Sequence, residues 1–152
     1  MALTIPQDKI ADYIGHQCEP THWHEVTQEQ VNGFADNTLD HQFIHIDPEA
    51  AAKTPFGGTI AHGFLTLSML SHFAETFGVE IEGAVMGINY GFDKVRFLSP
   101  VHVGKKIRAK AVIGDITEKK PKHYLTRYDV EVEIEGGETA LVAQWFAMVV
   151  VG

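Results

Sequence analysis

Residues 83–151 alternate between apolar and polar side chains along several runs, and turn residues close each run. A period of two places successive side chains on opposite faces of a strand. Proline and glycine lie between the runs, as is typical of turns. We therefore predict an antiparallel sheet with one exposed face, formed by residues 83–98, 105–116, 124–134 and 139–151.

The last of these runs, residues 139–151, is apolar on both faces and is interrupted only by Gln144. A strand of this kind needs cover on both sides. We expect it to lie inside the sheet or against a partner chain. It is too short to cross a membrane as a helix, which takes about 20 residues.

Residues 58–77 carry an apolar pattern with a helical period, and only His72 and Glu75 bring charge into it. A helix that is apolar all round is a buried helix. At about 1.5 Å per residue it would span roughly 25–30 Å, the width of a small domain. One long buried helix with an antiparallel sheet wrapped around it is the α+β arrangement known as the hot-dog fold, which we predict.

Before this segment the predicted elements are short. We expect a helix at residues 6–15, a strand at 23–26 and a helix at 27–35, where Thr27 is the N-cap and Gln30 has the spacing of a capping box. A further short helix begins after Asp47 as its cap, with Pro48 at the first position. Asp40 and His45 are expected in a turn that leads into a short extended stretch.

Composition narrows the class of protein. The 152 residues contain neither a linker nor a repeat, so we expect a single domain over residues 1–152. The formal net charge of −8 argues against nucleic acid as a partner, since phosphate binding needs a clustered basic face. Cys18 is the single cysteine, so no disulfide forms within the chain. Without a signal peptide or membrane helix in the sequence, we expect a cytoplasmic protein with no membrane contact.

Nine histidines are many for this length, and three of them, His41, His45 and His62, lie near Asp40 in the sequence. A carboxylate beside an imidazole is suited to acid–base catalysis near neutral pH. From the residues alone, an aspartate that caps a turn and a histidine packed in the core are the more frequent explanation of the pattern.

Gly63 stands at the entrance to the apolar helix. A helix N-terminus offers unpaired N–H groups, and a glycine allows a ligand to approach them closely. The carbonyl oxygen of a thioester, which gains negative charge when an enolate forms, would suit this position. Close packing of the helix against the sheet is the alternative reason for a glycine here.

Other candidate sites are weaker. His22 and His24 would share one face of a strand, and His45 with Asp47 could add ligands, but Asp47 serves better as a helix cap, so we predict no metal site. Ser68, Ser71 and Cys18 lack the surroundings of an activated nucleophile. Several phenylalanines flank the acidic turn and would line an acyl tunnel or belong to the core: Phe34, Phe43, Phe56 and Phe64.

The segment from Asp40 onward resembles the MaoC-like dehydratase family, which includes (R)-specific enoyl-CoA hydratases and nodulation-protein-N-like proteins. The family motif, Asp-x-Asn-Pro-hydrophobic-His, stands here as residues 40–45, followed by Asp-Pro at 47–48, Phe-Gly-Gly at 56–58 and His-Gly at 62–63. Residues 89–104 resemble the next strand and turn of the family. Gln42 and Phe43 replace the usual Asn and Pro, which resembles the nodulation-protein-N branch, and Leu39 replaces a glycine.

The resemblance implies a hot-dog acyl-thioester hydratase/dehydratase that adds or removes water across a 2-enoyl-CoA or enoyl-carrier-protein double bond. Asp40 and His45 match the catalytic pair, with His45 as the base, and Gly63 matches the amide that receives the thioester carbonyl. His62, Phe43 and Phe64 are the further residues expected at the substrate. The resemblance implies no metal or other cofactor, and a homodimer. A hot-dog thioesterase and a non-catalytic acyl-thioester binding module remain the alternatives.

Overall fold

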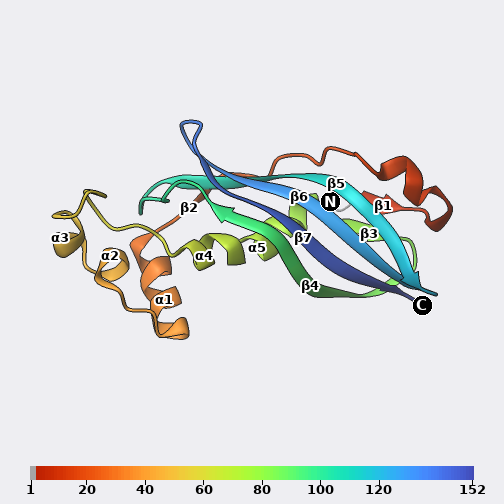
Figure 1. Cartoon of the computed structure of the whole chain (residues 1–152), viewed down its shortest axis with the longest axis horizontal. Helices are drawn as coiled ribbons and strands as arrows, with labels where there is room; N and C mark the ends of the chain where they lie inside the picture. Colours follow the sequence, from red (N-terminus) through yellow and green to blue (C-terminus); the bar gives the residue numbers. More distant parts are fainter. Residues whose placement is uncertain (1–2) are drawn as a thin grey trace.

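A curled five-stranded antiparallel sheet forms the body of the molecule in a computed structural model, which describes residues 3–152 (Figure 1). The strand order is β2-β5-β6-β7-β4. As predicted, β5, β6 and β7 follow one another as a meander, and β7 is an interior strand. The bounds are β2 (His24–Glu25), β4 (Ala84–Phe97), β5 (Lys106–Lys120), β6 (His123–Ile134) and β7 (Thr139–Val151).

The alternation on β5 and β6 sorts side chains between two faces. On β5, Ile107, Ala109, Ala111 and Ile113 are buried, while the residues between them are half-buried. The sequence pattern of period two is therefore fulfilled because one face packs on the core and the other meets solvent.

The central helix begins later than predicted. It comprises α4 (Gly63–Ser68) and α5 (Leu70–Phe77), joined at Met69, which at about 1.5 Å per residue spans about 22 Å. The prediction of a helix from residue 58 is wrong, because the Ile60 N–H donates to the Ile44 carbonyl at 3.0 Å and the Ala61 N–H to the Val101 carbonyl at 2.8 Å. These bonds hold the segment extended.

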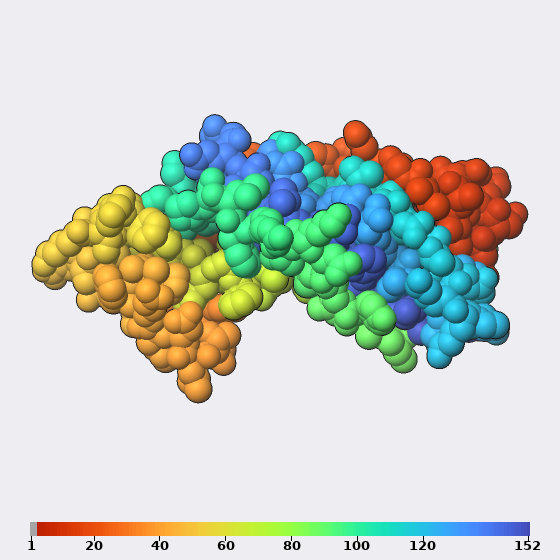
Figure 2. Space-filling model, viewed as in Figure 1, coloured from red at the N-terminus to blue at the C-terminus, as the bar shows by residue number. Residues whose placement is uncertain are grey.

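The helix is also not buried all round. Leu65, Leu70, Phe73 and Phe77 pack into the core, whereas Phe64 is 68% exposed. The exposed row continues through Ser68, Ser71, His72 and Glu75, whose polar side chains recur with a helical spacing. In Figure 2 the yellow-green surface of α4 and α5 lies open between the orange lobe and the green strand β4.

An N-terminal strap covers one edge of the sheet. After β1 (Leu3–Ile5), which pairs in parallel with β3 (Val79–Ile81), and the 3-10 helix η1 (Gln7–Tyr13), the chain runs beside β5. The N–H groups of Gly15, Cys18 and Thr21 donate to carbonyls of β5. At the opposite edge, β4 has no strand beyond it among residues 3–152.

Three helices form a lobe at one end of the molecule: α1 (Gln28–Thr38), α2 (Phe43–Ile46) and α3 (Pro48–Ala51) (Figure 1). The predicted caps are confirmed, since Thr27 Oγ1 accepts from the Gln30 N–H at 3.1 Å and Asp47 Oδ1 from the Ala50 N–H at 3.0 Å. The extended stretch expected after the turn of Asp40 and His45 is absent, because His45 lies in the helical turn α2, which is followed after Asp47 by α3. None of the helices within residues 3–152 has the length and apolarity needed to cross a membrane.

Helix α1 ends at Leu39, whose φ of 62° lies in the left-handed region. A residue with a Cβ pays about 1–2 kcal/mol there, which is the physical reason for a glycine at such a position. The Leu39 side chain is 80% exposed, so little packing offsets this cost.

Replacing Leu39 by glycine should therefore stabilise the fold by about 1 kcal/mol, measured as the free energy of unfolding in urea. Leu39→Ala is the matched control: it removes the same side chain but keeps the Cβ, so it should give little gain. Equal stability of the glycine and alanine variants would contradict a strained backbone at this position.

Candidate functional site

Asp40 lies directly after the left-handed residue that ends α1, at the surface of the lobe. Its Oδ1 accepts a hydrogen bond from the Gln42 N–H at 3.3 Å, which closes a short turn. The carboxylate itself is about half exposed, at 51%. Asp40 thus combines a local turn-capping role, one of the two readings of the sequence, with an open carboxylate that can meet a ligand.

His45 is buried in α2, and only 7% of the residue is exposed. Its Nδ1 lies 2.7 Å from the Ile60 carbonyl oxygen. A carbonyl only accepts, so Nδ1 carries the proton, and Nε2 of the neutral ring is left with a lone pair. Gln28 Nε2 donates to the His45 main-chain carbonyl at 2.7 Å and thereby ties α2 to α1.

His62, the N-cap of the central helix, brings the two groups together. Its ring stacks on that of His45 with centroids 3.8 Å apart and an interplanar angle of 26°. Its Nε2 donates to the Asp40 main-chain carbonyl at 3.0 Å and lies 3.9 Å from Asp40 Oδ2. Ligand atoms of Asp40, His45 and His62 all lie within 4.8 Å of one another. The structure therefore assembles three of the residues expected from the sequence.

His41, which is next to Asp40 in the sequence, faces elsewhere. Its Nε2 makes an exposed ion pair with Asp36 Oδ1 at 2.9 Å. Neither His22 nor His24 belongs to the cluster, and His24 Nε2 lies 2.9 Å from Gln30 Oε1. The sequence alone could not separate His41 from its neighbours, because its partner Asp36 lies on α1 and the direction of the side chain depends on the folded backbone.

A pocket of about 280 Å³ opens beside His45. Its buried residues include His45, Ala61, Thr66 and Ala140, and exposed apolar side chains such as Phe97 stand at the rim. A cavity with a mainly apolar lining and a few polar side chains, here His45, Thr66 and Ser99, is typical of a small-molecule site.

Gly63 lines the same pocket at the first position of α4, where the helix leaves its N–H groups unpaired. A Cβ at Gly63 would lie 3.0 Å from two ring carbons of Phe97, so a side chain here would crowd the pocket. Both readings of this glycine, close packing and an open N–H, fit the geometry. His62, Phe43 and Phe64, which the sequence suggested as substrate contacts, are not among the residues that line the pocket.

The cluster is a poor metal site despite its composition. Imidazoles bind metals in the plane of the ring, and the two stacked rings direct their lone pairs along nearly parallel planes. His45 Nδ1 and His62 Nε2 are also already engaged with carbonyl oxygens. The arrangement is better suited to proton transfer than to holding a cation.

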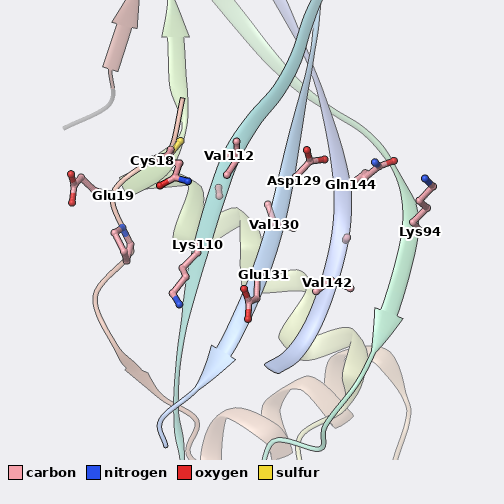
Figure 3. Close-up of a pocket in the computed structure, with 14 residues that line it drawn as sticks. Cys18, Glu19, Lys94, Lys110, Val112, Asp129, Val130, Glu131, Val142 and Gln144 are labelled. Carbon is pink, nitrogen blue, oxygen red and sulfur yellow. The ribbon is translucent and has the colours of Figure 1, made fainter. Parts of the chain in front are cut away.

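A larger hollow, of about 720 Å³, lies on the solvent face of the sheet (Figure 3). Two of its charged side chains are held by neighbours: Lys110 pairs with Glu133 at 2.5 Å, and Asp129 with Arg127 at 3.1 Å. Burial raises the pKa of the Cys18 thiol at its edge, so this cysteine is not an activated nucleophile. The hollow offers no base paired with a carboxylate in the way that the cluster at His45 does.

Comparison with known proteins agrees with the fold and the motif. A family model described as "MaoC like domain" matches residues 9–134. The chain is 44% identical over 146 residues to Nodulation protein N of Rhizobium meliloti, covering 95% of this chain and 91% of that protein. It is 41% identical over 136 residues to the 3-hydroxyacyl-thioester dehydratase Z of Mycobacterium tuberculosis, covering 89% of each.

Among solved structures, the monoamine oxidase regulatory protein from Archaeoglobus superposes with a TM-score of 0.83 at 30% identity, over 100% of this chain and 99% of that one. The likeness covers the sheet, the central helix and the lobe that carries Asp40 and His45. The matched family model, the sequence identity to the two relatives and this structural likeness agree. The chain belongs to the MaoC-like domain family.

Proposed function

We propose that this protein is a lyase that adds water to, or removes it from, the double bond of a 2-enoyl thioester. The observation that carries the proposal is the tautomer of His45: the Ile60 carbonyl holds the proton on Nδ1, so Nε2 is free as a base beside the Asp40 carboxylate. The likeness to a 3-hydroxyacyl-thioester dehydratase supports the same reaction.

In the direction of hydration, one water is held between the Asp40 carboxylate and His45 Nε2. His45 takes a proton from this water while the oxygen forms a bond to C3 of the enoyl group. The electrons of the C2–C3 double bond move toward the thioester, whose oxygen becomes enolate-like. The proton then returns to C2, with Asp40 relaying it, so that one water has been added overall.

The developing charge on the thioester oxygen needs a donor, and the Gly63 N–H at the start of α4 fills this role. It combines a free N–H with the positive end of the helix dipole. The thioester itself acidifies C2, so the reaction needs no metal or redox cofactor. The substrate is an acyl-CoA or acyl-carrier-protein thioester.

The open edge of the sheet supports a homodimer. Strand β4 exposes a row of large apolar side chains, namely Val85 (68%), Met86 (56%), Ile88 (44%) and Tyr90 (64%). An unpaired apolar edge is a template for pairing with another strand. The exposed face of α4 and α5 lies next to this edge, so a second copy that pairs along β4 would cover both (Figure 2).

The proposed reaction is tested with crotonyl-CoA, whose enoyl absorbance falls on hydration. Asp40→Asn and His45→Gln should each lower kcat about 10²–10⁴-fold, the usual contribution of a positioned acid or base. His41→Gln is the matched control, because it removes a neighbouring histidine that only pairs with Asp36, and it should retain activity.

Three results would contradict this assignment. Full hydration activity in Asp40→Asn would exclude the pair as the machinery. Release of free CoA without loss of the double bond would indicate a thioesterase. Tight binding of crotonyl-CoA with no turnover would indicate an acyl-thioester binding module.

Gly63→Ala should lower kcat/KM roughly tenfold or more while the protein still folds, because the new Cβ meets Phe97 at 3.0 Å and displaces the thioester. Steady-state kinetics of Gly63→Ala, of Phe97→Leu and of the double variant form the test. The double variant should recover part of the loss, since a smaller residue at 97 frees the space. Unchanged kinetics in Gly63→Ala would show that the thioester does not approach this position.

Ile88→Lys should convert the dimer to a monomer, measured by sedimentation velocity, because it places a charge in the apolar edge of β4. Ile14→Lys is the matched control: Ile14 is the same residue type with similar exposure, 43% against 44%, but lies in the N-terminal strap. It should leave the assembly intact. A monomeric wild-type chain, or an intact dimer in Ile88→Lys, would refute this interface.

A further inference from the structure

His62 is almost wholly buried, with 3% of its surface exposed, and yet it does not line the pocket. It contacts three groups of the site: the face of the His45 ring, the main-chain carbonyl of Asp40 and, at 4.9 Å between centroids, the Phe34 ring. A residue in this place can act on a reaction only through the residues it touches.

One nitrogen of this ring has no partner. Since the Asp40 carbonyl only accepts, His62 Nε2 carries the proton and Nδ1 is a bare acceptor. Among residues 3–152, His62 Nδ1 and Thr126 Oγ1 are the buried side-chain polar atoms without a hydrogen bond. A buried acceptor without a donor costs stability, so an apolar residue would be the better choice if filling space were all that was needed.

The Nε2–H of His62 is the buried anchor of the Asp40 turn. The turn is otherwise exposed, and its internal bond, from the Gln42 N–H to Asp40 Oδ1, is long at 3.3 Å. The bond from His62 to the Asp40 carbonyl, at 3.0 Å, joins this turn to the N-terminus of the central helix. It therefore fixes where the carboxylate stands relative to His45.

The face of the same ring supports His45. The His45 ring is held at its edge by the hydrogen bond from Nδ1 to the Ile60 carbonyl. The face of the ring stacks on the His62 ring, with the two centroids 3.8 Å apart. When His45 accepts a proton, its positive charge lies over the face of the His62 ring. One side chain thus holds the carboxylate through its edge and the base through its face.

The geometry points to His62 as a positioning residue that fixes the Asp40 carboxylate and the His45 ring relative to one another for the proton transfers. This inference rests on the proposed function and assigns His62 a role other than contact with the substrate. Its effect is exerted on kcat, because the ring holds the reacting groups, and it leaves KM nearly unchanged, because the ring lies outside the pocket.

Three substitutions separate the two contacts. His62→Leu fills the space without a donor or an aromatic face, His62→Gln keeps an N–H that can reach the Asp40 carbonyl, and His62→Phe keeps the stacked face. With crotonyl-CoA, kcat should fall about 100-fold in His62→Leu and only about tenfold in each of the other two, with KM within about twofold throughout. A residue that merely fills space would give full activity in His62→Leu and no recovery in His62→Gln.

A second measurement does not depend on turnover. Amide hydrogen exchange at His45 and Asp47, whose N–H groups bond to Gln42 and Phe43 in this segment, should be faster in His62→Leu and His62→Phe than in the wild type and in His62→Gln. If the wild-type protein shows no hydration activity and the exchange pattern still holds, the proposed function fails, but His62 is still the residue that holds the Asp40 turn in place. Equal exchange in all four proteins, or a rise in KM in place of a fall in kcat, would overturn the role given to His62.

Discussion

The hydrogen bond between His45 Nδ1 and the Ile60 carbonyl is the interaction on which the site depends. It selects the tautomer, with the proton on Nδ1 and a lone pair on Nε2. The carbonyl can do this only because residues 60 and 61 are held extended between Ile44 and Val101. The extended segment that delays the start of the central helix is thus the same segment that fixes the tautomer of His45.

Much of the sheet could be predicted from the sequence, because a period of two in side-chain burial is a local signal. The helix caps at Thr27 and Asp47 were equally local and are confirmed. The start of the central helix was not predictable in this way. Residues 58–62 are as apolar in an extended segment packed on Val101 as they would be in a helix, and only the cross-chain bonds distinguish the two.

The candidate site likewise contains residues that could be predicted from the sequence and contacts that could not. Asp40 and His45 could be named from the motif, since residue types at fixed spacing carry that information. The stack of His62 on His45 could not, because it joins α2 to the start of α4, and residues 47–61 lie between them in the sequence. Likewise, His41 adjoins Asp40 in the sequence but pairs with Asp36 on α1, and nothing in the residue types distinguishes it from the histidines of the cluster.

The N-terminal strap has a consequence for where another copy can join. Along β5, the carbonyls of Ala109, Ala111 and Ile113 already accept from the strap, so this part of the edge cannot accept another strand. An edge that is occupied in this way is closed to strand addition. The strap therefore leaves β4 as the long open edge and directs any pairing of the sheet to that side of the molecule.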